Sequence, residues 1–357
     1  MLDHDYWKEL EIELSKICRV IIHQVFQSEY NKEVYMFVLD VNENYGSVLV
    51  AVNTEDLISK HIKQTYPNEK ASNIRGVRGI KYNPGECDKF YFYAGEFSEK
   101  FENLIMQYET TIENLDFETD EHEINELKLK FLDSMVIVFN MIESDFKKLK
   151  TTKDFIFFVT ASDIDEKEAV QLIKKTVNPN LFNKVFPEVL AYESHLKHIY
   201  NSLSHKEQAK YWVSCYIDFS LNNNTNAVVK LKEMLRWESD LEEQITILGH
   251  EAIDDLIHEV DRFTRKRYFD GGAKINSHLA SSFLMMINTI ETLEELQVHK
   301  LLNLLHDVFY KNEELKINDT VIPWLARVIH SAKPNQFPRP IIGARDNKLE
   351  NFPEFGL

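Results

Sequence analysis

Residues 155–179, FIFFVTASDIDEKEAVQLIKKTVNP, decide which fold class is predicted for the first half of the chain. The apolar run FIFFVT has the length and the aromatic content of a short buried strand. A short polar joint follows this run. The next stretch of sequence, EKEAVQLIKKTV, repeats apolar residues at helical spacing, and Asn178–Pro179 ends the segment. A strand, a polar joint and a helix in this order indicate a domain that combines a sheet with helices.

The polar joint carries three acids, Asp163, Asp165 and Glu166. Such a cluster could ligate a divalent cation, but a calcium loop needs about five oxygen-bearing positions and a glycine turn within about twelve residues. Apolar and basic residues interrupt that spacing here, and no glycine follows. A cap formed by Ser162 or Asp163, with Glu166 reaching back to it, accounts for every acid. We therefore predict the start of a helix at this joint, without a metal site.

The residues before this stretch extend the same domain towards the N-terminus. Residues 5–28 repeat apolar side chains at helical spacing. Two strand-like runs follow, EVYMFVLDV and YGSVLVAV, joined by the turn-forming NEN, and NTEDL opens a helix over 54–65. A third run, KFYFYAG, precedes two long helical patterns. We predict an α+β domain over residues 1–186, with a small mixed or antiparallel sheet packed with helices.

Strand signals stop after Asn178–Pro179, and we expect the domain boundary between residues 178 and 206. The patterns that follow fit helices over 186–203, 205–221, 225–237, 241–267, 276–290, 292–311 and 319–331. They predict an all-helical domain over 187–332, either a helical bundle or a stack of hairpins. The remainder, 333–357, contains four Pro and two Gly. We expect it to be an extended tail packed on the surface by Phe337, Ile341, Ile342, Phe352 and Phe355.

Composition limits the classes of function. The formal net charge of −17 over 357 residues disfavours nucleic acid as a partner, because phosphates would be repelled. The three cysteines, Cys18, Cys87 and Cys215, are too sparse for a disulfide framework or a zinc cluster. No signal peptide and no apolar run of about 20 residues is visible. We expect a cytoplasmic protein with no membrane partner and no cofactor.

Several segments of the first half, taken in order, carry a resemblance to a known family. They are VNTEDL, GIKYNPGECDKFYFYAGEFSEKFENL and FIFFVTASDID with its closing VNP. Together they resemble the bacterial proteins of domain of unknown function 4303, over about residues 1–186. Where that family carries R-W-x-P-x-E-W, this chain has Lys81, Tyr82, Pro84, Glu86 and Cys87, so both Trp positions differ. The resemblance supplies no catalytic residue, and it implies a genomic setting like that of toxin-immunity loci.

The segment whose sequence is most similar to a metal site is GHEAIDDLIHEVDRF, residues 249–263. His250, Asp254 and His258 follow one another at four-residue spacing along one strip of a helix. A metallopeptidase helix needs H-E-x-x-H, and Asp254 stands where its second His belongs. Ligands on three successive turns would also span ~12 Å. The apolar face of the same helix leaves this strip near solvent, so we predict no bound metal and a solvent-facing role for the three residues.

Other candidate groups carry weaker signals. The sequence contains no nucleotide-binding glycine loop and no serine-hydrolase motif. His195 and His198 share a helix face, and His205 does not. One dense basic patch lies at a predicted helix C-terminus and comprises Arg262, Arg265, Lys266 and Arg267. Cations at this end of a helix complement the helix dipole. Alternatively, these cations could contact a phosphate or an acidic partner.

Three hypotheses of function remain. The first is a non-enzymatic cytoplasmic protein-binding protein, acting as an immunity factor that neutralises a toxin, with a partner of basic character. The second is an enzyme whose site is assembled from scattered residues around His250, Asp254 and His258. The third is a scaffold in which the helical half binds peptides. The first hypothesis fits the absence of catalytic motifs, the acidic charge and the resemblance, and we expect no catalytic, cofactor-binding or metal-binding residue.

Overall fold

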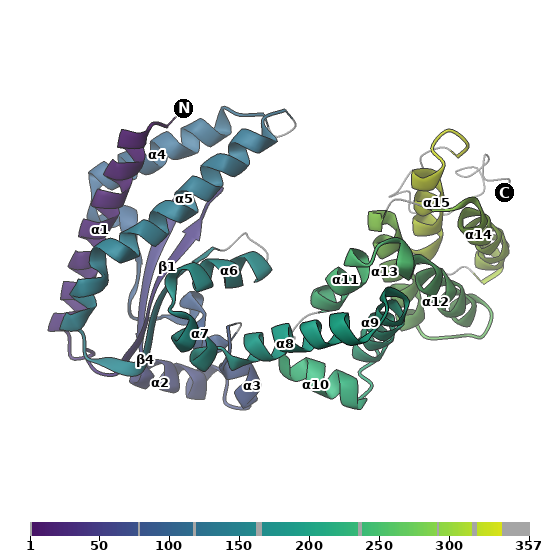
Figure 1. The fold of residues 1–357 in the computed structure, drawn as a ribbon, viewed down its shortest axis with the longest axis horizontal. Coiled ribbons are helices and arrows are strands. Elements are labelled where there is room, and N and C mark those ends of the chain that lie inside the picture. The colour runs from purple at the N-terminus through teal and green to yellow at the C-terminus, as the bar shows by residue number, and fades with distance from the viewer. Residues whose placement is uncertain are drawn as a thin grey trace. The chain divides into compact units, whose positions relative to one another are not determined.

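A computed structural model describes residues 2–77, 79–116, 119–161, 166–234, 238–290, 293–315 and 320–337 (Figure 1). The chain divides into two compact units, Met1–Leu190 and Ala191–Leu357. The first unit combines a four-stranded sheet with helices, and a run of helices follows it. The predicted fold class, α+β followed by all-α, is therefore confirmed.

The first unit contains one mixed sheet and the helices around it. Its strands are β1 (Val34–Asn42), β2 (Ser47–Thr54), β3 (Tyr91–Tyr93) and β4 (Thr151–Ala161). Its helices are α1 (His4–Gln27), α2 (Glu55–Thr65), α3 (Ala71–Ile74), α4 (Glu99–Glu113), α5 (Glu121–Ile142), α6 (Glu166–Thr176) and α7 (Pro179–Val185). Short 3-10 turns are η1 (Ile80–Tyr82), η2 (Pro84–Glu86), η3 (Ala94–Phe97) and η4 (Glu143–Lys148).

The strand order is β3-β2-β1-β4, with β1 antiparallel to β2 and parallel to β4. The central strand β1 is buried from Val34 to Val41, as expected for a strand that is covered on both faces. A register irregularity between Val34 and Met36 places Tyr35 and Met36 in the same hydrophobic cluster, although strand neighbours normally point to opposite faces.

Helices cover the two faces of this sheet (Figure 1). Helices α1, α4 and α5 enclose the larger cluster, which contains Phe37, Phe131 and Phe139. The opposite face holds a smaller cluster to which α2, α6 and α7 contribute. Tyr82 and Cys87 belong to this smaller cluster, so the segment containing η1 and η2 closes that face. The candidate site described below lies along this segment.

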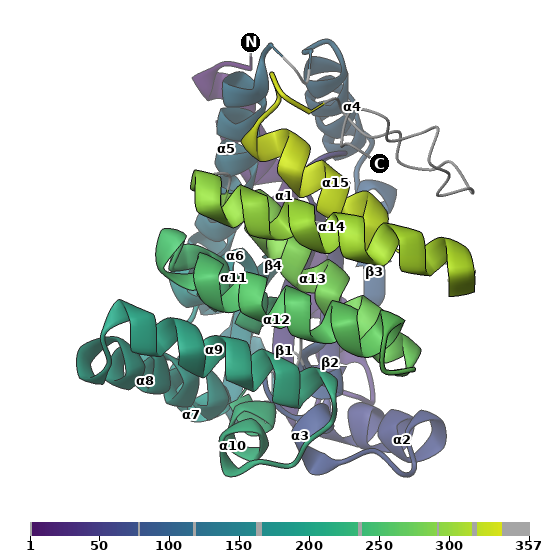
Figure 2. The same cartoon turned by 90° about the vertical axis from the view of Figure 1, so that its right-hand side faces the viewer.

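The second unit is helical throughout its described residues. The chain enters it in α8 (Pro187–Ser202) and continues through α9 (His205–Ser220), α10 (Asn226–Met234), α11 (Glu238–Ile247), α12 (His250–Tyr268), α13 (Lys274–Ile290), α14 (Glu295–Leu315) and α15 (Val321–Ala332). Helix α12 packs against α9, α13 and α14 (Figure 2). Its core includes Trp212, Phe263 and Phe283.

Two expectations about elements need correction. The helix predicted over 241–267 is two helices, α11 and α12, because Gly249 adopts a φ of 56° that a continuing right-handed helix does not allow. Strand β4 begins four residues before the run FIFFVT, at Thr151.

Two other expectations fall wholly or partly outside the described residues. The acids Asp163 and Asp165 of the predicted helix cap lie outside them, as do residues 338–357 of the predicted tail. Within the described part of the tail, Phe337 is partly buried against the core of the second unit.

Candidate functional site

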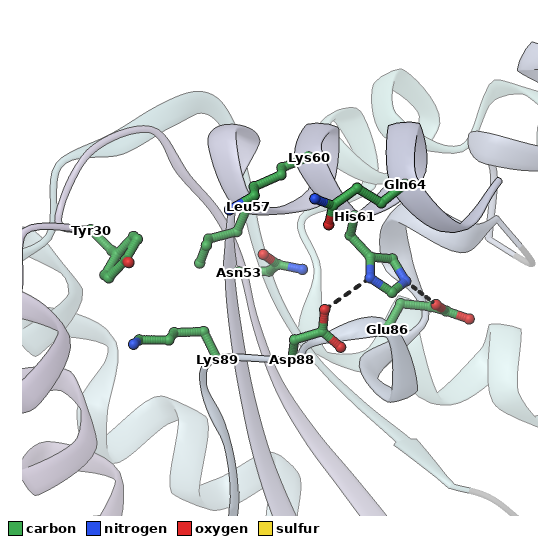
Figure 3. Close-up of a pocket in the computed structure, with 9 residues that line it drawn as sticks. All are labelled: Tyr30, Asn53, Leu57, Lys60, His61, Gln64, Glu86, Asp88 and Lys89. Atoms are coloured by element: carbon green, nitrogen blue, oxygen red, sulfur yellow. Dashed lines mark hydrogen bonds and ion pairs between the residues drawn. The ribbon is translucent and has the colours of Figure 1, made fainter. Parts of the chain in front are cut away.

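A pocket of about 230 Å³ opens on the first unit, between α2 and the segment that joins η2 to β3 (Figure 3). Polar and charged side chains predominate in its lining, which consists of Tyr30, Asn53, Leu57, Lys60, His61, Gln64, Glu86, Asp88 and Lys89. It combines residues from three places in the sequence: the loop after α1, the end of β2 together with helix α2, and the segment from the end of η2 towards β3. Part of the segment that carries the family resemblance, NPGECDK, therefore forms one wall.

Local sequence signals position both walls of this pocket. Helix α2 begins at a cap in which Thr54 Oγ1 accepts a hydrogen bond from the Leu57 N–H at 3.3 Å. On the other wall, Asn83 Oδ1 accepts from the Gly85 N–H at 3.0 Å, and Pro84 occupies the first position of η2. This short turn presents the Glu86 side chain towards α2.

His61 connects the two walls. Its Nε2 lies 2.6 Å from Glu86 Oε2, and its Nδ1 lies 2.9 Å from Asp88 Oδ2 (Figure 3). Ionised carboxylates only accept hydrogen bonds, so both contacts are satisfied only when both ring nitrogens carry a proton. The geometry therefore fits an imidazolium ion bridging two carboxylates.

The electrostatics of the pocket agree with this assignment. Burial lowers the pKa of His61, but the hydrogen bonds and charges of Glu86 and Asp88 outweigh this effect and raise the pKa above its ordinary value. Tyr66 donates to Glu86 Oε1 at 2.9 Å, and this hydrogen bond raises the pKa of Tyr66. A doubly protonated His61 has no lone pair with which to abstract a proton, so in this state it cannot act as a general base.

Cys87 lies between the two carboxylates in sequence, and its side chain is buried. Asn53 Nδ2 donates to its sulfur at 3.4 Å. Burial raises the pKa of the Cys87 thiol to about 12, so the thiolate form is scarce near neutral pH. Burial acts in the same direction on Cys18 and Cys215, whose pKa values are raised to about 12 and about 11. Cys18 belongs to the larger core cluster of the first unit, and Cys215 belongs to the core of the second unit.

Lys81 and Tyr82, which stand at the Arg and Trp positions of the family pattern, face the sheet. Lys81 Nζ lies 2.6 Å from Glu55 Oε1 and 4.7 Å from the centroid of the Tyr35 ring. Tyr82 makes edge-to-face contacts with Tyr35 and Phe186. The cation and the aromatic ring thus anchor the segment to the smaller core cluster.

The three residues singled out on α12 lie in the second unit, and their side chains are exposed. His250 Nε2 lies 3.3 Å from Glu294 Oε1, and Asp254 Oδ1 accepts from Gln297 Nε2 at 3.1 Å. These contacts connect the first turns of α12 to the start of α14. His258 points to solvent on the same helix, so the structure does not bring the three together around one point.

Two of the remaining histidines and the three arginines of the basic patch also have protein partners. His195 Nε2 lies 3.0 Å from the Tyr211 hydroxyl, and His198 Nδ1 lies 3.4 Å from Ser202 Oγ. His205 is the first residue of α9. In the basic patch, Arg262 pairs with Glu259, Arg265 pairs with Asp261 and Asp307, and Arg267 donates to the Gly272 carbonyl. The charges of Arg262 and Arg265 are therefore balanced by carboxylates of the second unit.

Two other kinds of site, a metal centre and a membrane-spanning helix, are absent from the described residues. Within them, no three His, Cys, Asp or Glu side chains are grouped in a way that could hold a metal ion. Their helices also include none with the length and apolar character needed to span a membrane.

No sequence pattern marks His61, Lys60 or Lys89 as residues of a site. His61 lacks a motif, because its partners stand 25 and 27 residues away. One usable signal was present. Glu86 stands at the acid position of the family pattern and ends the turn Pro84–Glu86, from which a carboxylate can reach a side chain elsewhere in the fold.

Comparison with protein families assigns the first unit. Residues 14–179 match the family described as domain of unknown function (DUF4303), and the resemblance predicted for the N-terminal half is confirmed. The matched range contains every residue of the His61 pocket. No curated protein and no solved structure matches the chain.

Proposed function

We propose that this chain is a non-enzymatic protein-binding protein. One observation carries the proposal: both ring nitrogens of His61 are held by carboxylates, at 2.6 and 2.9 Å. In a general base, one ring nitrogen must face the substrate with its lone pair free. Here the most reactive side chain of the pocket instead fixes the pocket's shape.

The other reactive groups of the described residues fit the same role. The three thiols are buried, with pKa values raised by burial, which disfavours nucleophilic catalysis by a thiolate. The pocket offers a bound ligand fixed charges and hydrogen-bonding groups within a volume of about 230 Å³. Fixed charges of this kind give specificity for a partner of complementary charge.

Charge and family membership suggest the kind of partner. A net charge of −17 attracts a basic protein and raises its association rate, by about 10- to 1000-fold in strongly steered pairs. The genomic setting implied by the family resemblance is that of toxin-immunity loci. We therefore propose that the chain acts in the cytoplasm as an immunity factor, and that its partner is a basic toxin protein.

Affinity purification of the full chain from its native host, at low salt, tests this proposal. We expect one protein to be recovered in a stoichiometric complex, to have a basic isoelectric point, and to be less toxic when co-expressed with this chain. A substrate turnover by the purified chain that disappears in His61→Gln, in a variant that still folds, would contradict the proposal.

A further inference from the structure

The charges of the His61 pocket differ in sign from those of the molecule as a whole. The pocket is lined by Lys60, Lys89 and protonated His61 and by the carboxylates of Glu86 and Asp88, which together give it a net charge of +1 in a chain with net charge −17. Glu86 and Asp88 are both engaged by His61. The cationic groups that remain available to a bound ligand are therefore the two lysines.

The two lysines have no carboxylate partner among the described residues. Lys60 is exposed on α2. Lys89 Nζ lies 5.2 Å from the centroid of the Tyr30 ring, a cation–π contact that leaves the ammonium without a counter-charge. In Figure 3, Lys89 lies on the Tyr30 side of Asn53, whereas His61 and Glu86 lie on the other side. The pocket is thus cationic at one end and closed by the His61 bridge at the other.

We propose that this pocket receives the acidic side chain of an aspartate or glutamate from the protein partner, with its carboxylate between Lys60 and Lys89. The proposal rests on the proposed function, since it names the anchor of the same partner. A single carboxylate would neutralise the pocket's net charge. The stem of that side chain would lie against Leu57 and the ring of Tyr30, which provide apolar surface beside the lysines.

Two features bear on the choice between a protein side chain and other anionic ligands. The volume of about 230 Å³ lies below the ~300–1,000 Å³ of most small-molecule sites, which disfavours an organic ligand of drug size. Phosphates commonly bind the free N–H groups of helix N-termini, whereas Lys60 lies in the second turn of α2 and Lys89 lies on the segment between η2 and β3. Asp88 is 74% exposed, and its second oxygen can accept a hydrogen bond from a peptide N–H next to the anchoring residue.

Titration of the full-length, ¹⁵N-labelled chain with blocked tripeptides tests this inference. The probes are acetyl-Gly-Glu-Gly-amide, its Gln and Lys counterparts, and inorganic phosphate, and the readout is the amide shift of Lys89. We expect saturable binding of the Glu peptide, weakening as salt is added, and at least about tenfold weaker binding of the Gln peptide. Equal affinity for the Glu and Gln peptides, or tighter binding of phosphate than of the Glu peptide, would overturn the inference.

Matched variants assign the binding to the two lysines. Lys60→Gln/Lys89→Gln should weaken binding of the Glu peptide by about tenfold, because each exposed ion pair contributes a factor of about two to five. Lys60→Arg/Lys89→Arg should retain binding, which separates loss of charge from loss of fold. Lys63→Gln alters an exposed lysine of α2 outside the pocket and should have no effect. Unchanged binding in the double Gln variant would refute the assignment.

The same variants separate this inference from the proposed function. If a purified partner binds the double Gln variant as tightly as it binds the original chain, the anchor is wrong and the protein-binding function stands. If the Glu peptide requires both lysines but no partner protein can be recovered, the pocket's specificity is correct and the proposed function fails.

Discussion

At the scale of single residues, His61 connects two segments that the chain brings together only through folding. Glu86, 25 residues away, and Asp88, 27 residues away, face opposite sides of one imidazole ring. Because the His61 side chain is only 16% exposed, these hydrogen bonds are partly shielded from water. This arrangement has a consequence for stability that depends on pH.

We predict that His61→Gln destabilises the protein more at low pH than at high pH. The folded-state pKa of His61 is raised above the unfolded value of about 6.5, so its stabilising effect is full below about pH 6.5 and is lost as the pH rises through the folded pKa. At about pH 5.5 the free energy of unfolding should fall by about 1–2 kcal/mol. At about pH 9 the difference should be smaller.

Urea unfolding followed by circular dichroism measures this difference. His122→Gln is the control, since His122 is an exposed histidine of the same unit without a partner among the described residues. A loss of stability in His61→Gln that is identical at both pH values would show that His61 acts by packing and not by charge.

The thiols give a second prediction for single residues. Burial of Cys18, Cys87 and Cys215 and their raised pKa values should make all three unreactive towards iodoacetamide in the folded chain at about pH 8. Mass spectrometry should detect no adduct under native conditions and three adducts in urea. Rapid modification of Cys87 in the folded state would mean that the η2–β3 segment opens readily, and that the His61 bridge is weak.

At the scale of elements, the sequence predicted most helices and strands of the first unit, because hydrophobic periodicity and caps are local signals. Helix α2 begins directly after Thr54, at the cap that NTEDL indicates. The break between α11 and α12 was missed because apolar spacing continues across Gly249, and only its φ of 56° shows the interruption. The His61 bridge was also missed. It depends on how α2 and η2 meet, and no local pattern encodes that contact.

Helix α8 provides a prediction at this scale. Its first turn carries Glu188, whose Oε1 accepts from the Val77 N–H at 2.7 Å, beside Gly76, which has a φ of 95°. Glu188→Ala removes this acceptor, so the free energy of unfolding should fall by about 1–2 kcal/mol. Lys197→Ala, an exposed position later in α8, is the control and should be neutral.

The hydrogen bond between Glu188 and Val77 should also affect the stability of N-terminal fragments of different length. A fragment 1–186 lacks Glu188, whereas a fragment 1–203 retains it together with the rest of α8. We expect both fragments to fold, with 1–203 the more resistant to urea. A 1–203 fragment that is no more stable than 1–186 would show that the Glu188 contact contributes nothing, and an unfolded 1–203 fragment would show that the two units depend on each other to fold.

At the scale of the whole molecule, the strand and helix patterns predicted the two classes of architecture, and composition left the function open. A charge of −17 constrains the partner through its long-range field, and it does not locate a site. The candidate site is one small region of opposite charge, where Lys60 and Lys89 have no carboxylate partner among the described residues. We propose that the acidic surface as a whole steers the partner and that the pocket anchors it.

The association rate of the purified partner with the full chain, measured by stopped flow across a range of salt, tests this account most directly. Between about 20 and about 150 mM salt the Debye length falls from about 20 to about 8 Å, so steered association should slow by at least about tenfold. The dissociation rate should change much less. An association rate that is the same across this range would contradict the account, because the acidic surface would then play no part in recognising the partner.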